Sequence, residues 1–217
     1  MIKDHLKQVK ASIPKKVKLV AVSKTNSVER ILEAHVAGQK IFGENRVQEL
    51  LPKHEALPKD IEWHVIGHLQ TNKVKFIAPF VSVIHSIDSF RLLKEVNAQA
   101  RKNERIIEVL LQFHVAQEET KYGLSYEDAV AILEDPSFRE MKNIRVVGIM
   151  GMASFVDDEN QIRQEFKKLK TIFDKIKEYY FSKDDSFKEL SMGMSSDYQL
   201  AIEEGSTMVR VGSKIFQ

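Results

Sequence analysis

Residues 17–25 read VKLVAVSKT, and the rest of the chain is interpreted from this stretch. Four of its first six residues are aliphatic, and they do not alternate with polar residues as in a half-exposed strand. Such a run is typical of a strand that is covered on both faces, as in α/β proteins. The run ends at Lys24. This lysine is either a solvated charge that closes the strand or an amine at the mouth of a barrel that can form a Schiff base.

Strand-like stretches alternate with helical patterns along the whole chain, which predicts parallel strands joined by right-handed crossovers. Eight such units favour a closed (β/α)8 barrel over an open sheet, and we expect residues 1–217 to form one domain. An amphipathic helix is predicted over residues 1–13. No helix is expected after the eighth strand, and the first helix is expected to cover that gap. The seven further strands are predicted at 40–45, 61–68, 81–88, 106–115, 144–153, 189–195 and 208–216.

The composition excludes several classes of function. The 33 basic and 31 acidic residues give a net charge of +2, so neither nucleic acid nor another polyelectrolyte is expected as a partner. The absence of cysteine excludes disulfides, thiolate metal ligands and a cysteine nucleophile. We find no signal-peptide core and no apolar run long enough to span a membrane, so a cytoplasmic protein is expected. The even charge favours a monomer.

Glycine and serine cluster after the last two predicted strands. Residues 193–197 read GMSSD, and Gly212-Ser213 ends the eighth strand. Each group is either an ordinary turn or part of an anion site. Barrels of this class commonly bind phosphate in the loops after strands seven and eight. A phosphate bound there would face Lys24 across the mouth of the barrel.

Arg210 is a charge inside the apolar strand MVRVG and shares a face with Gly212. A buried arginine needs a partner. That partner is either an acidic group inside the barrel or an acceptor atom of a cofactor, such as a pyridine nitrogen.

His64 and His68 are the candidates for a metal pair. On an extended strand they would lie about 13 Å apart, which is too far to share a metal ion unless the chain turns sharply at Gly67. We therefore expect no metal site. No nucleophile elbow, Walker motif or dinucleotide fingerprint is present.

Several longer motifs follow one another along nearly the whole chain. They are AVSKT around Lys24, FGENRVQEL at 42–50, WHVIGHLQTNK at 63–73, SID at 86–88, ETKYG at 119–123, GIMGMA at 148–153, LSMGMSSD at 190–197 and GSTMVRVGSKIF at 205–216. In this order they resemble the motifs of the pyridoxal phosphate homeostasis proteins. The chain differs from the usual pattern at His68, where proline is common, and at Gln217, where glycine is usual.

The resemblance implies an alanine-racemase-like barrel that binds pyridoxal 5′-phosphate (PLP). Lys24 matches the lysine that forms the internal aldimine, and Arg210 matches the residue that faces the pyridine nitrogen. The matches to the phosphate-binding positions are Ser195, Gly212 and Ser213. Asn45 and His64 match motif residues near the cofactor.

The chemistry of these residue types agrees with the implied site. A free lysine has a pKa of about 10.4, so a Schiff-base lysine needs desolvation or a nearby cation. The apolar run before Lys24 is expected to supply the first and Arg210 the second. A permanent donor such as Arg210 leaves the pyridine nitrogen unprotonated and makes the ring a weaker electron sink. This favours holding PLP over carbanion chemistry.

We therefore expect a PLP carrier that acts in vitamin B6 homeostasis, with PLP-dependent apo-enzymes as the partners it would supply. The alternative is a PLP-dependent amino-acid racemase. Lys24 is the one evident acid/base group, whereas racemisation needs such groups on both faces of the substrate. The racemases that resemble the chain also use a further C-terminal domain. A third hypothesis is a PLP-free barrel that acts on a sugar phosphate through a lysine Schiff base.

Overall fold

The computed structural model describes residues 1–117 and 122–217 of the chain. In these residues eight parallel strands form a closed barrel, in which each strand pairs with the next and β8 pairs with β1. This confirms the predicted barrel. The strands are β1 Lys18–Val22, β2 Ile41–Glu44, β3 Glu62–Val65, β4 Val83–Ile87, β5 Ile107–Gln112, β6 Ile144–Met150, β7 Glu189–Ser191 and β8 Met208–Val211.

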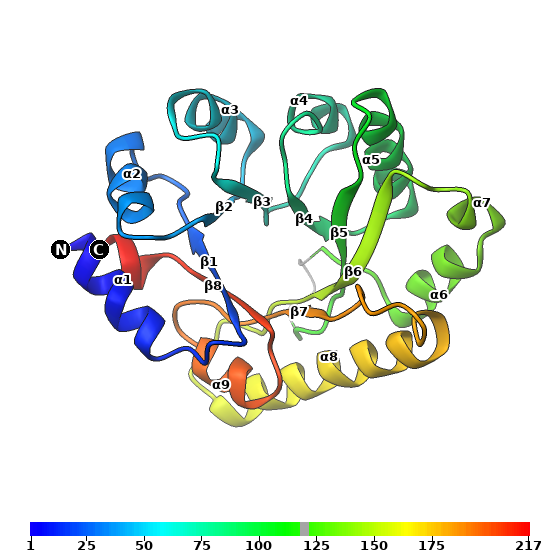
Figure 1. Ribbon diagram of the computed structural model, residues 1–217. Coiled ribbons are helices and arrows are strands. Elements are labelled where there is room, and N and C mark those ends of the chain that lie inside the picture. Colours follow the sequence, from blue (N-terminus) through cyan, green and yellow to red (C-terminus); the bar gives the residue numbers. More distant parts are fainter. Residues whose placement is uncertain (118–121) are drawn as a thin grey trace.

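The helices form a ring outside the strands (Figure 1). Within the described residues no helix combines the length and the apolar character needed to cross a lipid bilayer. The helices are α1 Ile2–Ala11, α2 Val28–Val36, α3 Val47–Ala56, α4 Val74–Ile77, α5 Phe90–Lys102, α6 Tyr126–Glu134, α7 Pro136–Arg139, α8 Glu159–Tyr180, α9 Tyr198–Glu203 and α10 Ser213–Phe216, with a 3-10 turn η1 Thr71–Lys73 before α4.

The C-terminal segment corrects one expectation. Residues 213–216 were predicted as the end of the eighth strand, with no helix to follow, but they form α10. The strand ends because Gly212 leaves the extended conformation, and Ile215 and Phe216 are then buried. Helix α1 packs against α10 and α2, so it covers this side of the barrel as expected (Figure 1).

The described residues of the barrel form two apolar regions. The larger one lies between the strands and the helices and includes Phe42, Trp63 and Ile84. A separate buried cluster consists of Val83, Leu110, Val147 and Met150, with Met152 against it. Alternation along a strand directs these residues to the barrel interior, where branched apolar side chains are usual. The polar residues described below share this interior.

Candidate functional site

The predicted site residues gather at the carboxyl end of the barrel. Lys24 lies two residues beyond β1, and Asn45 directly follows β2. Ser195 lies in the loop after β7, while Gly212 and Ser213 directly follow β8. Because all strands of the barrel are parallel, these loops meet at one rim.

The ends of β7 and β8 are joined by a hydrogen bond. The backbone N–H of Gly212 donates to Oγ of Ser195 across 3.1 Å. A Cβ atom at Gly212 would lie 3.0 Å from the carbonyl oxygen of Val22, so the end of β8 lies close against the end of β1. The loop that carries Lys24 and the loops that carry Ser195 and Gly212 are therefore neighbours.

Lys24 itself is exposed, which corrects the expectation that the apolar run would desolvate its amine. The strand ends at Val22, and Lys24 lies in the following turn rather than inside the barrel wall. The next residue, Thr25, has a positive φ of 63°. This conformation is rare for a β-branched residue and indicates a constrained turn.

A chain of polar side chains crosses the barrel interior below this rim. Nδ1 of His64 lies 2.9 Å from Nε2 of His85, and Nδ1 of His85 lies 3.0 Å from Oγ of Ser191. Nη1 of Arg210 donates to the same Ser191 hydroxyl across 2.5 Å, and Nη2 donates to the carbonyl of Gly151 across 3.0 Å. The chain links β3, β4, β7 and β8, and it fixes the guanidinium group of Arg210.

The bonds of this chain also assign the ring hydrogens. Arginine can only donate, so Ser191 accepts from Arg210 and has its own hydrogen for Nδ1 of His85. His85 then carries its hydrogen on Nε2 and donates it to Nδ1 of His64. Both rings are neutral in this arrangement. Burial lowers the pKa of His64 to about 3, with the charge of Lys18 as a second cause.

The pKa values of His85 and Arg210 are lowered as well. Burial lowers the pKa of His85 well below 6.5, and the neighbouring His64 and Arg210 lower it further. Burial also lowers the pKa of Arg210 to about 10, although Asp197 opposes this shift. Arg210 is therefore a cation at neutral pH beside two neutral histidines.

His64 and His68 have different surroundings. His64 is buried inside the barrel, whereas His68 lies beyond the end of β3 and is exposed. Nδ1 of His68 is 3.0 Å from Oδ2 of Asp88, and its ring stacks on Tyr122 with 4.0 Å between centroids. In the described part of the chain, no three histidine, cysteine or acidic side chains are grouped so that they could hold a metal ion.

The rim is hollowed between the loops that follow β2 and β3. This hollow has a volume of about 520 Å³, and its lining includes Asn45, Glu49, His68 and Gln70. A Cβ atom at Gly67 would lie 2.5 Å from the carbonyl oxygen of Asn45, so the two loops pack here without an intervening side chain. Gly67 thereby fixes the backbone of Asn45 at the rim.

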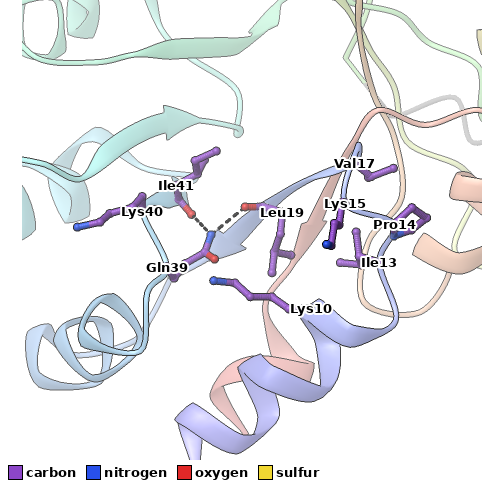
Figure 2. A pocket seen from close by; sticks show the side chains of 9 residues that line it. All are labelled: Lys10, Ile13, Pro14, Lys15, Val17, Leu19, Gln39, Lys40 and Ile41. Atoms are coloured by element: carbon purple, nitrogen blue, oxygen red, sulfur yellow. Dashed lines mark hydrogen bonds between the residues drawn. The ribbon is translucent and has the colours of Figure 1, made fainter.

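A second hollow, of about 330 Å³, lies at the opposite end of the barrel, where β1 and β2 begin (Figure 2). The residues that line it include Lys10, Leu19 and Ile41. The side-chain amide of Gln39 donates to the carbonyl oxygens of Leu19 and Ile41 across 2.8 and 2.7 Å. This hollow contains none of the predicted site residues.

Some residues that shape the site were not found from the sequence. Glu44 and Lys53 form a buried ion pair of 2.6 Å beside the Lys24 turn. Ser191 binds Arg210 directly, and His85 is linked to Arg210 through Ser191. A signal existed for Glu44, which is a charge within the apolar strand stretch KIFGEN. Residues 119–121 of the ETKYG motif lie outside the described residues.

Comparisons with known proteins confirm the resemblance found in the motifs. The alanine racemase N-terminal domain family matches residues 1–217. A pyridoxal phosphate homeostasis protein of Aquifex aeolicus is 42% identical over 200 residues, which cover 92% of this chain and 86% of that protein. The human protein of the same name is 39% identical over 220 residues, which cover 92% of this chain and 75% of that protein.

Solved structures agree with these relatives. PipY of Synechococcus elongatus, solved with PLP bound, matches with a TM-score of 0.90 and 33% identity, and the match covers 100% of both chains. Alanine racemase of Clostridium difficile matches with a TM-score of 0.79 over 99% of this chain and 58% of that one. At 12% identity this second likeness shows the fold alone.

Proposed function

The chain belongs to the alanine racemase N-terminal domain family and, within it, to the pyridoxal phosphate homeostasis proteins, and on this premise we propose that it binds PLP through Lys24 and acts in intracellular PLP homeostasis. The observation that carries the proposal is that three features lie at, or just below, one rim of the barrel. These are the amine of Lys24, the hydrogen-bonded ends of β7 and β8, and the buried cation Arg210.

The residues present fit PLP in their chemistry. PLP supplies an aldehyde carbon to which a lysine amine adds, with the aldehyde oxygen leaving as water. Ser195 and Ser213 supply hydroxyl groups that suit a phosphate, and the backbone N–H of Gly212 holds the Ser195 hydroxyl in place. Gly212 has no side chain that would separate an anion from its backbone.

Arg210 is the residue we assign to the pyridine nitrogen. Two of its five N–H groups are used by Ser191 and Gly151, and the cation is held in a low-dielectric interior. A permanent donor at this nitrogen disfavours its protonation. Asn45 lies at the rim and is assigned to contacts with the ring. His64, which is engaged with His85, is assigned to support of the site from below.

A carrier role, rather than an enzymatic one, is part of the proposal. It is supported by Arg210, because an unprotonated pyridine ring withdraws electrons weakly. A racemase would form product from a D- or L-amino acid in a way that depends on Lys24.

We further propose a monomer in the cytoplasm that supplies PLP-dependent apo-enzymes. Light scattering, cell fractionation and transfer of PLP to an apo-aminotransferase test these three points.

The experiment that tests PLP binding is reduction with borohydride followed by mapping of the modified peptide. We expect PLP-treated protein to gain one phosphopyridoxyl group on Lys24 and Lys24→Ala to gain none at that position. Lys15, an exposed lysine at the other end of the barrel, serves as the matched control through Lys15→Ala. Equal labelling of Lys24 and Lys15 at low PLP concentrations would contradict the proposal.

A further inference from the structure

The turn that carries Lys24 is held by hydrogen bonds on both sides of the lysine. On one side, Oγ of Ser23 donates to Oε1 of Glu44 across 2.6 Å, and the carbonyl oxygen of Ser23 accepts from Nζ of Lys53 across 2.9 Å. On the other side, the backbone N–H of Thr25 donates to Oε2 of Glu49 across 3.1 Å. We call Ser23, Glu44, Glu49 and Lys53 the anchoring cluster.

Lys53 is the centre of this cluster. It is only 7% exposed, and its ammonium lies 2.6 Å from Oε1 of Glu44 and 3.9 Å from Oε2 of Glu49. One cation thus links the carboxylate that binds Ser23 with the carboxylate that binds Thr25. The cluster comes mainly from β2 and α3, which are rigid elements, whereas Lys24 lies in a turn.

The turn needs such support because its conformation is unfavourable. Thr25 has a φ of 63°, a region that L residues with a branched Cβ rarely adopt. The carbonyl oxygen of Lys24 accepts from Oγ1 of Thr25 across 2.6 Å and from Nδ2 of Asn26 across 3.1 Å. A strained backbone persists only where its surroundings over-determine it, and strained positions concentrate at functional sites.

The side chain of Lys24 is exposed, so no packing of its own directs it. The backbone fixes only the direction in which its Cα–Cβ bond leaves the turn. We propose that Lys53 is a positioning residue, which acts with Glu44 and Glu49 to hold the strained Ser23–Thr25 backbone and so to direct the amine of Lys24 into the mouth of the barrel. This inference rests on the proposed PLP binding for its ligand, but the anchoring itself does not depend on PLP.

The experiment compares three variants. Lys53→Met removes the cation but leaves Glu44 as an uncompensated buried carboxylate, which can prevent folding. The variant with both Glu44→Gln and Lys53→Met leaves neither charge, and it is the one on which the test depends. Lys177→Met is the matched control. Lys177 is half-buried in α8 and donates to the carbonyl oxygen of Phe187 across 2.5 Å, and Phe187 precedes the start of β7, at the end of the barrel opposite the rim.

The first readout does not involve PLP. We expect exchange of the Thr25 amide hydrogen with solvent to be about tenfold faster in the double variant, because its backbone is released. It should be unchanged in Lys177→Met. Unchanged exchange in the double variant would overturn the anchoring, whatever the protein does with PLP.

The second readout separates positioning from binding. Pyridoxine 5′-phosphate carries an alcohol in place of the aldehyde, so it can occupy the site without reacting with Lys24. In the double variant, we expect borohydride-fixed PLP on Lys24 to fall about tenfold at a subsaturating concentration, which equals about 1.4 kcal/mol. The affinity for pyridoxine 5′-phosphate should change less than about threefold.

The outcomes are distinguishable. Equal losses for PLP and pyridoxine 5′-phosphate would show that the whole site has collapsed and would overturn the positioning role. No loss for either would overturn it as well. If the wild-type protein binds neither compound, the proposed function fails, and the exchange of Thr25 alone then decides whether the anchoring cluster exists.

Discussion

At the scale of single residues, His64 and His85 are neutral rings joined by a hydrogen bond, and the charges of Lys18 and Arg210 act on them. The pKa of His64 in the fold is about 3, compared with 6.5 for an ordinary histidine, and that of His85 is also well below 6.5. In the pH range between these values the unfolded chain binds more protons than the folded one. The free energy of unfolding must therefore fall as the pH falls through this range.

We expect this loss to be visible between pH 6.5 and about 4.5, above the range in which most carboxylates titrate. Each histidine contributes up to about 1.4 kcal/mol per pH unit. Urea unfolding at a series of pH values measures the slope. The variant with both His64→Leu and His85→Leu should flatten it, because neither ring remains to be protonated. A slope that is the same in this variant and in the wild type would contradict the neutral pair.

Arg210 shows which contacts the sequence alone does not predict. Arg210 was expected to be buried and to need a partner, and it is buried. Its hydrogen bonds go to a hydroxyl and a backbone carbonyl, whereas the acidic Asp197 acts on it through its charge. Ser191 and Gly151 lie 19 and 59 residues away along the chain. Nothing in the local pattern around Arg210 identifies them, since only the closure of the barrel brings these strands together.

At the scale of elements, the rim depends on how the loops after β2 and β3 pack on each other. A Cβ atom at Gly67 would lie 2.5 Å from the carbonyl oxygen and 2.8 Å from the Cα atom of Asn45. Both are backbone atoms, so Gly67→Ala must move one loop away from the other. We expect PLP occupancy at Lys24 to fall several-fold and stability to fall by about 1–3 kcal/mol. Borohydride labelling and urea unfolding measure the two effects.

Gly38→Ala is the matched control for this substitution. Gly38 follows α2 at the other end of the barrel and has a φ of 91°, and a Cβ atom added to it would meet no other atom within 4 Å. Alanine there introduces backbone strain of about 1 kcal/mol without touching the rim. It should lower stability and leave PLP occupancy as in the wild type. If both substitutions lowered occupancy equally, the effect would come from stability and not from the contact with Asn45.

The elements were predictable where a repeated pattern marked them. Apolar residues at helical spacing predict a helix over residues 162–180, and α8 forms there. Strands β1, β4 and β5 lie within the predicted stretches. The apolar residues are Ile162, Phe166, Leu169, Phe173, Ile176 and Tyr180. The ends of the strands were less predictable. The stretch 61–68 was expected to be one strand, but β3 ends at Val65, so His68 lies on the rim beside Asp88. The sequence does not mark the end of β3, because the apolar run continues past Val65. The glycine that could have marked it, Gly67, comes two residues later.

At the scale of the whole molecule, the barrel closes by pairing β8 with β1, so the first and last parts of the chain depend on each other. Lys18 and Val20 pair in register with Met208 and Arg210, and α1 packs on α10. That residues 1–217 form one domain remains a prediction. It implies one cooperative unfolding transition, since no part of a closed barrel can leave without exposing the rest.

Binding of PLP should raise the temperature of this transition as a whole. A ligand at about 100 times its dissociation constant stabilises the folded state by about 2.7 kcal/mol, which corresponds to a rise of roughly 5–10 °C for a chain of this size. Scanning calorimetry with and without PLP measures the rise. In Lys24→Ala, the rise caused by PLP should come from phosphate and ring contacts alone. It should equal the rise that pyridoxine 5′-phosphate causes in the wild type. Two separate transitions, of which PLP moved one, would instead show that the barrel comprises two units.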